Sequence, residues 1–363
     1  MSNFTLNGTE SKVTEAVCFL HDSTGAKTGR VIPYCFIIPL SLVSNSLVVA
    51  IVCKDRRMHK TVNFFIVNMS IADLLATVVY MPRVVSIWLA GYEWQIDGIA
   101  GFIFCKMSVC LNQTSIAVSI FTVVAISLDR FFAVVFPLRV FITDKISQII
   151  ILCIWMAALL ASFPQFYGIK TMRNNGLLYC FLELDKIFGE GAATAFYMFI
   201  MLGLFAIPLA ITVILYSAIL IALLKRRRVI GDALSNNDDR LRRQERTRKK
   251  VLKMVSMVVA CFILCWLLYF IHSILYSYKI IVPCTVLYLR LLLAHLNSIV
   301  NPFIYWFFNE NFRRGFRSIF AHSFPGVALS PRVFPLNSAQ QTNDTCSSAR
   351  RARIGETSNG RGE

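Results

Sequence analysis

Charged residues are scarce in this sequence: they make up 16 % of its 363 residues, whereas a soluble globular domain has about 25 %. Hydrophobic residues reach 56 %, and the mean hydropathy is +0.61. This hydrophobicity excludes a disordered chain and is too high for a soluble domain. A nucleic-acid-binding protein would account for the net charge of +17 but not for the hydropathy. The composition therefore indicates a protein that crosses a membrane several times.

Internal repeats and catalytic motifs are also absent. Transporters are commonly built from repeated halves around a continuous polar path, so a polytopic transporter is the weaker alternative from a different class. A membrane enzyme would need paired catalytic groups. The apolar segments contain no HExxH motif, Asp-Asp cluster or Ser/His/Asp arrangement, and the five His residues are scattered. We therefore expect a membrane protein that is not an enzyme.

Seven apolar stretches are long enough for a helix that crosses a bilayer, which takes roughly 20 residues. They are too long for membrane β-strands, which alternate in hydrophobicity over about 9–11 residues. The sequence therefore predicts an all-α membrane protein, a bundle of seven transmembrane helices. The expected helices are Ile32–Cys53, Val62–Pro82, Phe102–Val135, Ile146–Tyr167, Ala192–Leu224, Val251–Tyr278 and Cys284–Phe308.

The basic residues lie on one side of the expected membrane. Segments 54–60, 128–150, 225–253 and 306–363 carry net charges of +3, +1, +8 and +4, which leaves +1 for the rest of the chain. Because positively charged loops stay in the cytoplasm, these segments are expected inside and the N-terminus outside. The basic inner face is suited to anionic membrane lipids. The charge thus reports topology and gives no support for nucleic-acid binding.

These assignments divide the chain into four regions. Near the C-terminus, Phe312 and Phe316 share one helical face with arginines beside it, as in a helix that lies along a membrane surface. The regions are an extracellular N-terminus (1–31), the bundle (32–308), a short amphipathic interfacial helix (309–320) and a disordered cytoplasmic tail (321–363).

The polar N-terminal region carries sites for extracellular modification. Asn3 and Asn7 each begin an Asn-x-Thr sequon, which predicts glycosylation on the outer side. Cys18 and Cys284 are both expected outside, where disulfides can form. They either form a bridge or remain free thiols, and the sequence does not decide between these alternatives.

Several polar side chains interrupt the apolar spans, where an ionisable residue is costly and usually functional. Asp73 lies in the middle of the second span. If the polar residues converge, their oxygens could hold a small cation such as sodium, with Asp73 as the anionic ligand. Alternatively, they only hydrogen-bond one another and hold the helices together, and each arrangement could exist in a different state. The residues at this depth are Asn45, Asp73, Ser119, Asn297, Ser298 and Asn301.

Two motifs near the inner ends of the spans point to a family. Asp129-Arg130-Phe131 closes the third span, and Asn301-Pro302-Phe303-Ile304-Tyr305 lies in the seventh. With them, the chain resembles the rhodopsin-like (class A) G-protein-coupled receptors over all seven spans and the amphipathic helix. Phe131 replaces the Tyr of the family's Asp-Arg-Tyr motif. Further matches to the family are Asn45, Asp73, Trp94, Trp155, Pro208 and Tyr216.

The resemblance implies how the protein works. A disulfide would join Cys105 to Cys180 across the outer mouth of the bundle. Agonist binding in the outer cavity would favour an inner face open to a heterotrimeric G protein. The same resemblance implies that arrestin and receptor kinases are further partners and that the protein lies in the plasma membrane. Apart from an allosteric sodium ion, no cofactor is expected. The residues expected to act in activation and coupling are Asp129, Arg130, Tyr216, Ile120, Pro208, Phe262, Trp266, Asn301, Pro302 and Tyr305.

The sixth span departs from the family pattern. The family's Cys-Trp-x-Pro reads Cys265-Trp266-Leu267-Leu268 here, so the Pro that kinks this helix is missing. Leu268 is therefore expected to weaken the bend. The acidic residue often found at the base of this span is also missing, which leaves Asp129 as the expected resting partner of Arg130.

The ligand is narrowed first by exclusion. The position that holds an Asp in amine receptors is Asn112, and the position that holds the retinal Lys of opsins is His295. The third span is close to receptors of the neuropeptide Y, RFamide, galanin and tachykinin type, so a neuropeptide is the expected ligand. A non-peptide ligand, or an orphan receptor active without one, is the alternative.

The expected ligand contacts lie on the span faces near the outer cavity and in the second outer loop. The acidic loop residues could pair with an Arg-bearing peptide or form an ordinary solvated loop. Histidines in such positions, here His272 and His295, are more often helix-packing residues than ligand contacts. The expected contacts are Asn112, Gln113, Glu183, Asp185, Trp266, Tyr269, His272, Leu291 and His295.

Overall fold

The computed structural model describes residue 19 and residues 22–174, 176–233, 239–278, 280 and 282–323. Within these ranges the side chains of 174, 226–233, 239–252, 254–255, 277 and 320–323 are not described. The chain divides into two units, Met1–Ile319 and Phe320–Glu363. The first unit holds the helical bundle. Of the second unit only Phe320–Ser323 is described. The prediction of a disordered tail was wrong for residues 321–323, which continue a helix. The rest of the tail lies outside the described residues, as do the sequons at Asn3 and Asn7.

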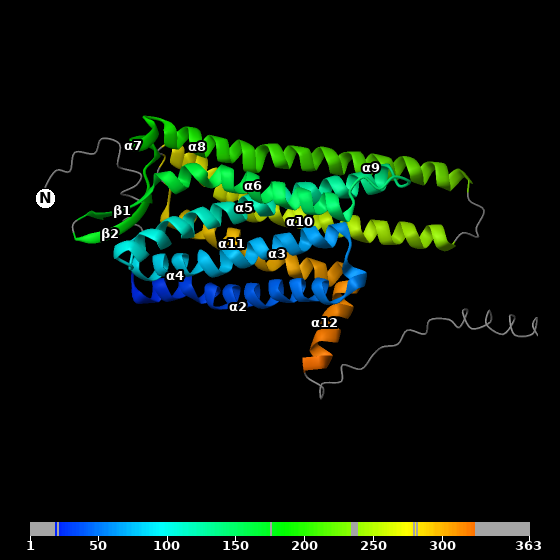
Figure 1. The fold of residues 1–363 in the computed structure, drawn as a ribbon, viewed down its shortest axis with the longest axis horizontal. Coiled ribbons are helices and arrows are strands. Elements are labelled where there is room, and N and C mark those ends of the chain that lie inside the picture. The colour runs from blue at the N-terminus through cyan, green and yellow to red at the C-terminus, as the bar shows by residue number, and fades with distance from the viewer. Residues whose placement is uncertain are drawn as a thin grey trace, which may run out of the picture. The chain divides into compact units, whose positions relative to one another are not determined.

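The first unit is a bundle of long helices that run side by side (Figure 1). Among the described residues, seven helical segments are long and apolar enough to cross a membrane, which confirms the predicted number of spans. The helices of these spans are α2 (Thr24–Lys54), α3 (Thr61–Val79) with α4 (Met81–Ala90), α5 (Gly98–Val135), α6 (Asp144–Gly168), α8 (Ala192–Met201) with α9 (Ile207–Ala233), α10 (Asp239–Ser277) and α11 (Cys284–Phe308).

The first helix begins earlier than the sequence predicted. We expected polar, unstructured chain up to residue 31, but α2 starts at Thr24 after the N-cap Ser23, whose hydroxyl accepts a hydrogen bond from the Ala26 N–H. Arg30 forms an ion pair with Asp22 and lies over the Phe19 ring at 4.4 Å. Capping and these side-chain contacts thus extend the helix beyond its apolar stretch.

In two of the seven spans the α-helix is interrupted, and in the sixth span it is not. In the fifth span a π-helical turn, η2 (Leu202–Ala206), separates α8 from α9 just before Pro208. In the second span a break at Tyr80 separates α3 from α4, in which Pro82 occupies the first turn, where its missing N–H is tolerated. In contrast, α10 runs unbroken through Leu268. Because α2, α6 and α11 are also unbroken although each contains a proline, continuity does not test the bend, and the weaker kink at Leu268 stays a prediction.

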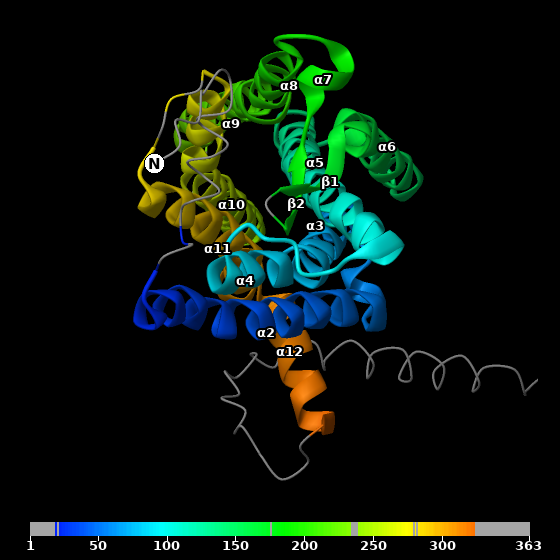
Figure 2. The same cartoon turned by 90° about the vertical axis from the view of Figure 1, so that its left-hand side faces the viewer.

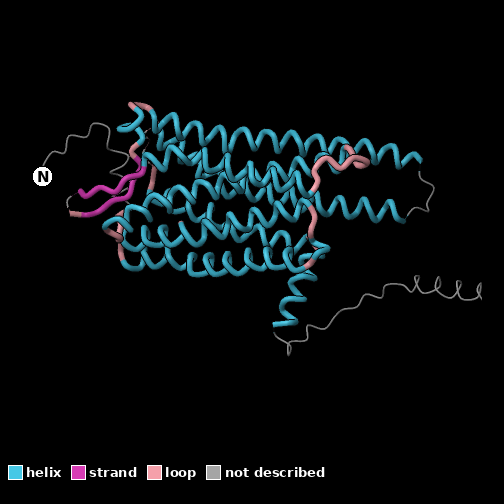
Figure 3. Tube along the Cα trace, in the orientation of Figure 1, coloured by secondary structure: helices cyan, strands magenta, loops and turns pink. Residues whose placement is uncertain are grey.

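A short β-hairpin lies at one end of the otherwise helical bundle (Figure 3). Strands β1 (Ile169–Asn174) and β2 (Leu177–Leu182) pair antiparallel, with Ile169 opposite Leu182. We predicted a loop here but no strands. The Asn175-Gly176 dipeptide between the two strand segments is a recognised hairpin signal, and Gly176 has a positive φ of 82°. A short helix, α7 (Leu184–Phe188), follows.

The amphipathic helix expected at 309–320 is present as α12 (Glu310–Ser323), which turns sharply away from the direction of α11 (Figure 1). Phe312 is fully buried and stacks on Tyr305 of α11, with ring centroids 5.8 Å apart. Gly315 lies directly against Ile51 of α2, where a side chain at position 315 would overlap it. These contacts join α12 to the ends of the first and seventh spans.

Candidate functional site

The polar residues predicted in mid-span converge around Asp73, which is buried on α3. Its two carboxylate oxygens accept hydrogen bonds from the Ser298 hydroxyl at 3.1 Å and from the Asn301 amide at 3.3 Å. Asn45 of α2 donates to the Ser298 carbonyl oxygen at 2.9 Å. The Asp73 carboxylate therefore links α3 to α11, and Asn45 links α2 to α11, in line with the idea that polar residues hold the helices together.

This polar core also contains acceptors that the described residues do not satisfy. The side-chain oxygens of Asn45, Asn297 and Asn301 are buried and have no hydrogen-bond partner there. A buried polar atom without a partner is costly, so such a cluster favours a bound water or cation. Amide and carboxylate oxygens are the ligands of hard cations, and the donor set therefore suits sodium with Asp73 as the charged ligand.

Two observations limit this site. Ser119 is buried on α5, but no described hydrogen bond joins it to Asp73. Its place in the cluster thus stays a prediction. No group of three or more His, Cys, Asp or Glu side chains gathers as a metal site within the described ranges. A cation here would have Asp73 as its single carboxylate, which does not suit a tightly held divalent metal.

Near the C-terminal end of α5, Arg130 pairs with its neighbour Asp129, as predicted. The Arg130 Nε donates to Asp129 Oδ2 at 2.9 Å, and Nη2 contacts the same oxygen. Phe131, which replaces the family Tyr, packs against Phe136 with ring centroids 6.3 Å apart. Arg246, Arg248 and Lys249 of α10 have side chains outside the described set, so the expected absence of an inter-helix lock stays a prediction.

The other residues expected in coupling are not joined to Arg130 by described hydrogen bonds. The Tyr305 hydroxyl donates to Met69 Sδ at 3.4 Å. The Tyr216 hydroxyl is buried and interacts with the Ser127 side chain and with the charge of Arg130. Pro302 is buried on α11 beside Asn301. In this structure the Tyr305 hydroxyl is therefore engaged with α3, whereas Tyr216 interacts with the charge of Arg130.

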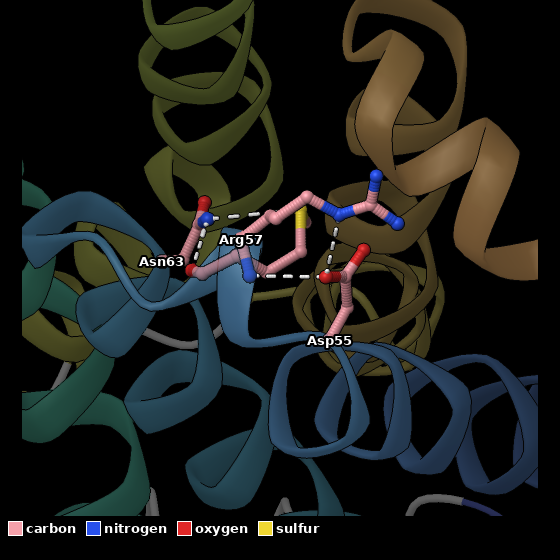
Figure 4. Close-up of polar contacts among 4 residues, drawn as sticks. Asp55, Arg57 and Asn63 are labelled. Carbon is pink, nitrogen blue, oxygen red and sulfur yellow. Dashed lines mark hydrogen bonds and ion pairs between the residues drawn. The ribbon is translucent and has the colours of Figure 1, made fainter.

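The first inner loop is ordered by its own polar contacts (Figure 4). Asp55 caps the 3₁₀ turn η1 (Arg56–Met58), and its carboxylate accepts hydrogen bonds from the Arg57 N–H at 3.0 Å and from Arg57 Nε at 3.2 Å. The backbone hydrogen bond from Arg57 lowers the pKa of the Asp55 carboxyl from its usual value. Asn63, which is buried, donates to the Met58 carbonyl oxygen at 2.6 Å.

The packing residues expected to move on activation lie in the main apolar core. Ile120 and Phe262 belong to it, and Pro208 is buried at the start of α9. Phe262 lies 6.1 Å from Trp266 between ring centroids, and the Trp266 ring meets Tyr269 edge-on at 5.4 Å. An aromatic column thus connects this packing to the outer cavity.

Some of the expected ligand contacts already have hydrogen-bond partners within the protein, and others have buried polar atoms without a described partner. His295 is hydrogen-bonded through Nδ1 to the Tyr34 hydroxyl at 3.0 Å, so its packing role is shown. Gln113 Nε2 and Trp266 Nε1 are buried without a described hydrogen-bond partner. Asn112, His272 and Leu291 are buried as well, and Tyr269 is partly buried. Ligand contact by these residues stays a prediction.

The acidic residues of the second outer loop have partners within the loop region. Glu183 Oε1 forms an ion pair with Lys186 Nζ at 2.7 Å. Asp185 Oδ1 accepts a hydrogen bond from the Ala193 N–H at 2.9 Å, in the first turn of α8. Both carboxylates are therefore engaged in local structure. Their pairing with a ligand stays a prediction.

The outer mouth of the bundle is fastened by the predicted disulfide. Cys105 at the start of α5 is bonded to Cys180 in β2, with an S–S distance of 2.06 Å. Viewed along the bundle, the hairpin lies across the middle of the ring of helices (Figure 2). Cys284 is also disulfide-bonded. Cys18, which from the sequence could form a bridge with Cys284, lies outside the described residues.

The sequence reasoning missed two residues at the outer end. Tyr34 is the partner of His295, and nothing in an apolar stretch signals such a pairing. Arg83 lies in the second span, where its guanidinium stacks over the Trp94 ring at 4.6 Å. The predicted span ended at Pro82, so Arg83 was not recognised as an ionisable residue inside a span, which would have made it a functional candidate.

Residues 44–305 match the family described as 7 transmembrane receptor (rhodopsin family). The chain therefore belongs to this family, the class A G-protein-coupled receptors, whose members are signalling receptors and not enzymes. It is a multi-pass protein of the plasma membrane. The predicted family is thus confirmed.

Within the family the chain is similar to peptide receptors. It is 31 % identical to the neuropeptide FF receptor 2 of Rattus norvegicus over 307 residues, which are 79 % of this chain and 71 % of that protein. Identity to the neuropeptide FF receptor 1 of Homo sapiens is 31 % over 336 residues, covering 86 % and 76 %. For the substance-P receptor of Meriones unguiculatus it is 29 % over 296 residues, covering 79 % and 69 %.

Proposed function

We propose that this receptor binds an extracellular neuropeptide and passes the signal to a heterotrimeric G protein. The observation that carries the proposal is the similarity to neuropeptide FF and substance-P receptors, which extends over at least 79 % of the chain. The absence of the amine-pairing Asp at Asn112 and of the retinal Lys at His295 supports a peptide over those ligands.

The proposed orientation puts the N-terminus and the hairpin outside and the C-terminus inside. The four basic segments support it, because positively charged loops stay cytoplasmic. The Cys105–Cys180 disulfide supports it too, because such bonds form in the oxidising compartment that becomes the cell exterior. Glycosylation at Asn3 and Asn7 belongs to the same proposal.

Signal transfer is proposed to be a shift between two states of the bundle. In the present state Arg130 is neutralised by Asp129. A G protein that takes up Arg130 would favour the open state, and by linkage the peptide and the G protein would strengthen each other's binding. Arrestin, receptor kinases and anionic lipids are proposed as further partners of the basic inner face.

A sodium ion is proposed as an allosteric ligand of the polar core. The support comes from the buried, partnerless oxygens of Asn45, Asn297 and Asn301 beside the Asp73 carboxylate. A cation there would stabilise the present arrangement of the spans. It would oppose activation if activation contracts the core, because the contraction would have to expel the ion.

The test is expression in cells that carry sensors for each G-protein class, challenged with a panel of neuropeptides. We expect at least one peptide to give a saturable response that Arg130→Ala abolishes while surface expression is retained. Ser217→Ala, whose exposed hydroxyl donates to the Val213 carbonyl of its own helix, is the control. A response to lipids or amines and to no peptide would reject the ligand class. A response that Arg130→Ala leaves intact would reject the coupling mechanism.

A further inference from the structure

Arg83 is a cation near the outer end of the second span whose charge the described residues do not balance. Its Nη1 and Nη2 lie 3.4 Å from the carbonyl oxygens of Glu93 and Tyr92. Both contacts are long and involve neutral acceptors. The ion pairs within 4.0 Å among the described residues do not include Arg83. The guanidinium is thus stacked on Trp94 but has no counter-ion.

The other arginines at this end show what is unusual about Arg83. Arg30 is paired with Asp22 and Arg173 with Asp97. Arg173 lies on β1 and is exposed, but Arg30 lies in the α2 span and is only partly exposed, as Arg83 is, and it is nevertheless paired. A cation removed from water without a counter-ion is costly, so a site of this kind is completed when an anion binds.

Arg83 lies close to the hairpin through its neighbours Glu93 and Trp94. Its stacking partner Trp94 donates its backbone N–H to the Leu178 carbonyl of β2 at 2.7 Å, and Glu93 forms an isolated β-bridge with Tyr179. The hairpin that these contacts anchor lies over the middle of the helix ring (Figure 2). A ligand that passes the hairpin therefore comes close to the guanidinium.

We infer that Arg83 binds an anionic group of the ligand, a carboxylate of a peptide C-terminus or of an acidic side chain. This inference rests on the proposed function and specifies the chemistry of the peptide. The planar guanidinium presents five donors, and two of them are committed to the weak carbonyl contacts. The remaining donors allow the paired hydrogen bonds that Arg makes to a carboxylate, with Trp94 holding the plane in place.

The experiment uses synthetic peptides in matched pairs that differ only in charge. One pair has a C-terminal carboxylate or a C-terminal amide, and the other has an internal Glu or Gln. Their potencies are measured on the full-length receptor, on Arg83→Gln and on Arg83→Lys, with surface expression matched. Arg173→Gln, which removes a cation already paired with Asp97, is the control.

We expect Arg83→Gln to lower the potency of one anionic peptide about 10- to 100-fold while the potency of its neutral twin is unchanged, as for loss of a charge-assisted hydrogen bond. Arg83→Lys should retain part of the preference for the anionic peptide over its neutral twin, because lysine keeps the positive charge but lacks the paired donors of the guanidinium. Arg173→Gln should leave the selectivity between twins intact.

Three results would overturn the inference. An equal loss for both twins in Arg83→Gln would mean that the residue only holds Trp94 and the loop. Potencies that do not change in Arg83→Gln, on a wild-type receptor that peptides do activate, would reject the anion site and leave the proposed function standing. Failure of every peptide on the wild-type receptor would reject the proposed function, and the inference with it.

Discussion

The outer end of this receptor and its polar core treat polar groups in opposite ways. At the outer end, a disulfide, a hairpin and the Asp22–Arg30, Asp97–Arg173 and Glu183–Lys186 ion pairs connect polar groups to defined partners. In the polar core around Asp73, three amide oxygens are buried without described partners.

We call the outer end the frame, because its groups have fixed partners. We call the polar core around Asp73 the switch, because its groups can change partners. A region with matched charges and a covalent link has one preferred arrangement, which holds a binding cavity in shape. A core with spare acceptors can exchange partners, take up water or a cation, and repack at modest cost. The receptor is therefore expected to keep its outer geometry while the helices rearrange at mid-depth and below.

The largest effect should follow from opening the frame. Cys105→Ser removes the disulfide, and loss of a native disulfide typically costs about 2–5 kcal/mol. We expect strongly reduced surface expression, measured with an N-terminal epitope tag on intact cells. The control is Cys153→Ser, which changes an exposed cysteine that is a free thiol. Normal expression of Cys105→Ser would show that the frame does not depend on the covalent link.

The second largest effect should come from restoring the missing kink below the frame. Leu268→Pro removes a backbone N–H and forces the ring against the preceding turn of α10, at a cost of about 3 kcal/mol for a straight helix. We expect higher ligand-independent signalling, because a bent α10 places its inner half further from the bundle. Leu268→Ala, which keeps the backbone hydrogen bond, is the control. Unchanged basal signalling in a well-expressed Leu268→Pro would contradict this role of the unbroken helix.

A smaller effect should appear when the anion of the polar core is neutralised. Asp73→Asn keeps the shape and removes the charge that sodium needs. In the purified wild-type receptor we expect NaCl to raise the melting temperature over an equal concentration of N-methylglucamine chloride, by about 2–4 °C for roughly 1 kcal/mol of binding. Asp73→Asn should abolish this difference, and Ser115→Ala, whose hydroxyl bonds within its own helix, should retain it. Equal stabilisation of Asp73→Asn would place the ion elsewhere.

The smallest effects concern the inner loop, which allows a direct comparison of a buried with an exposed polar group. Asn63→Ala leaves the Met58 carbonyl without its donor and should cost about 1 kcal/mol. Asp55→Asn changes an exposed cap, and its effect on the melting temperature should be smaller still.

The Asp55 cap also has a defined pH dependence. Because folding lowers the pKa of Asp55, its contribution is present above the usual carboxyl pKa and is lost as the pH falls through the lowered value. Melting curves of wild type and Asp55→Asn should therefore converge in acid. A larger loss in Asp55→Asn than in Asn63→Ala at neutral pH would reverse the comparison.

Much of this architecture was accessible from the sequence because a bilayer imposes simple rules. Apolar length fixed the seven spans, and Asp73 with Ser298 and Asn301 met as the motifs implied. The hairpin was missed because two six-residue strands gain their stability from each other and from Cys105, which lies far away in sequence. The Tyr34–His295 bond was missed for the same reason, since the partners are 261 residues apart.

The π-helical turn in the fifth span has a consequence for how its side chains point. A π-turn inserts one residue into the helix, and each residue of an α-helix turns the chain by about 100°. Residues of α8 therefore face about a quarter-turn away from where an uninterrupted helix through Pro208 would aim them. A helical wheel drawn continuously from Ala192 to Tyr216 would assign pocket-facing and lipid-facing positions of α8 wrongly, whereas a wheel with one residue omitted within η2 would place them in register.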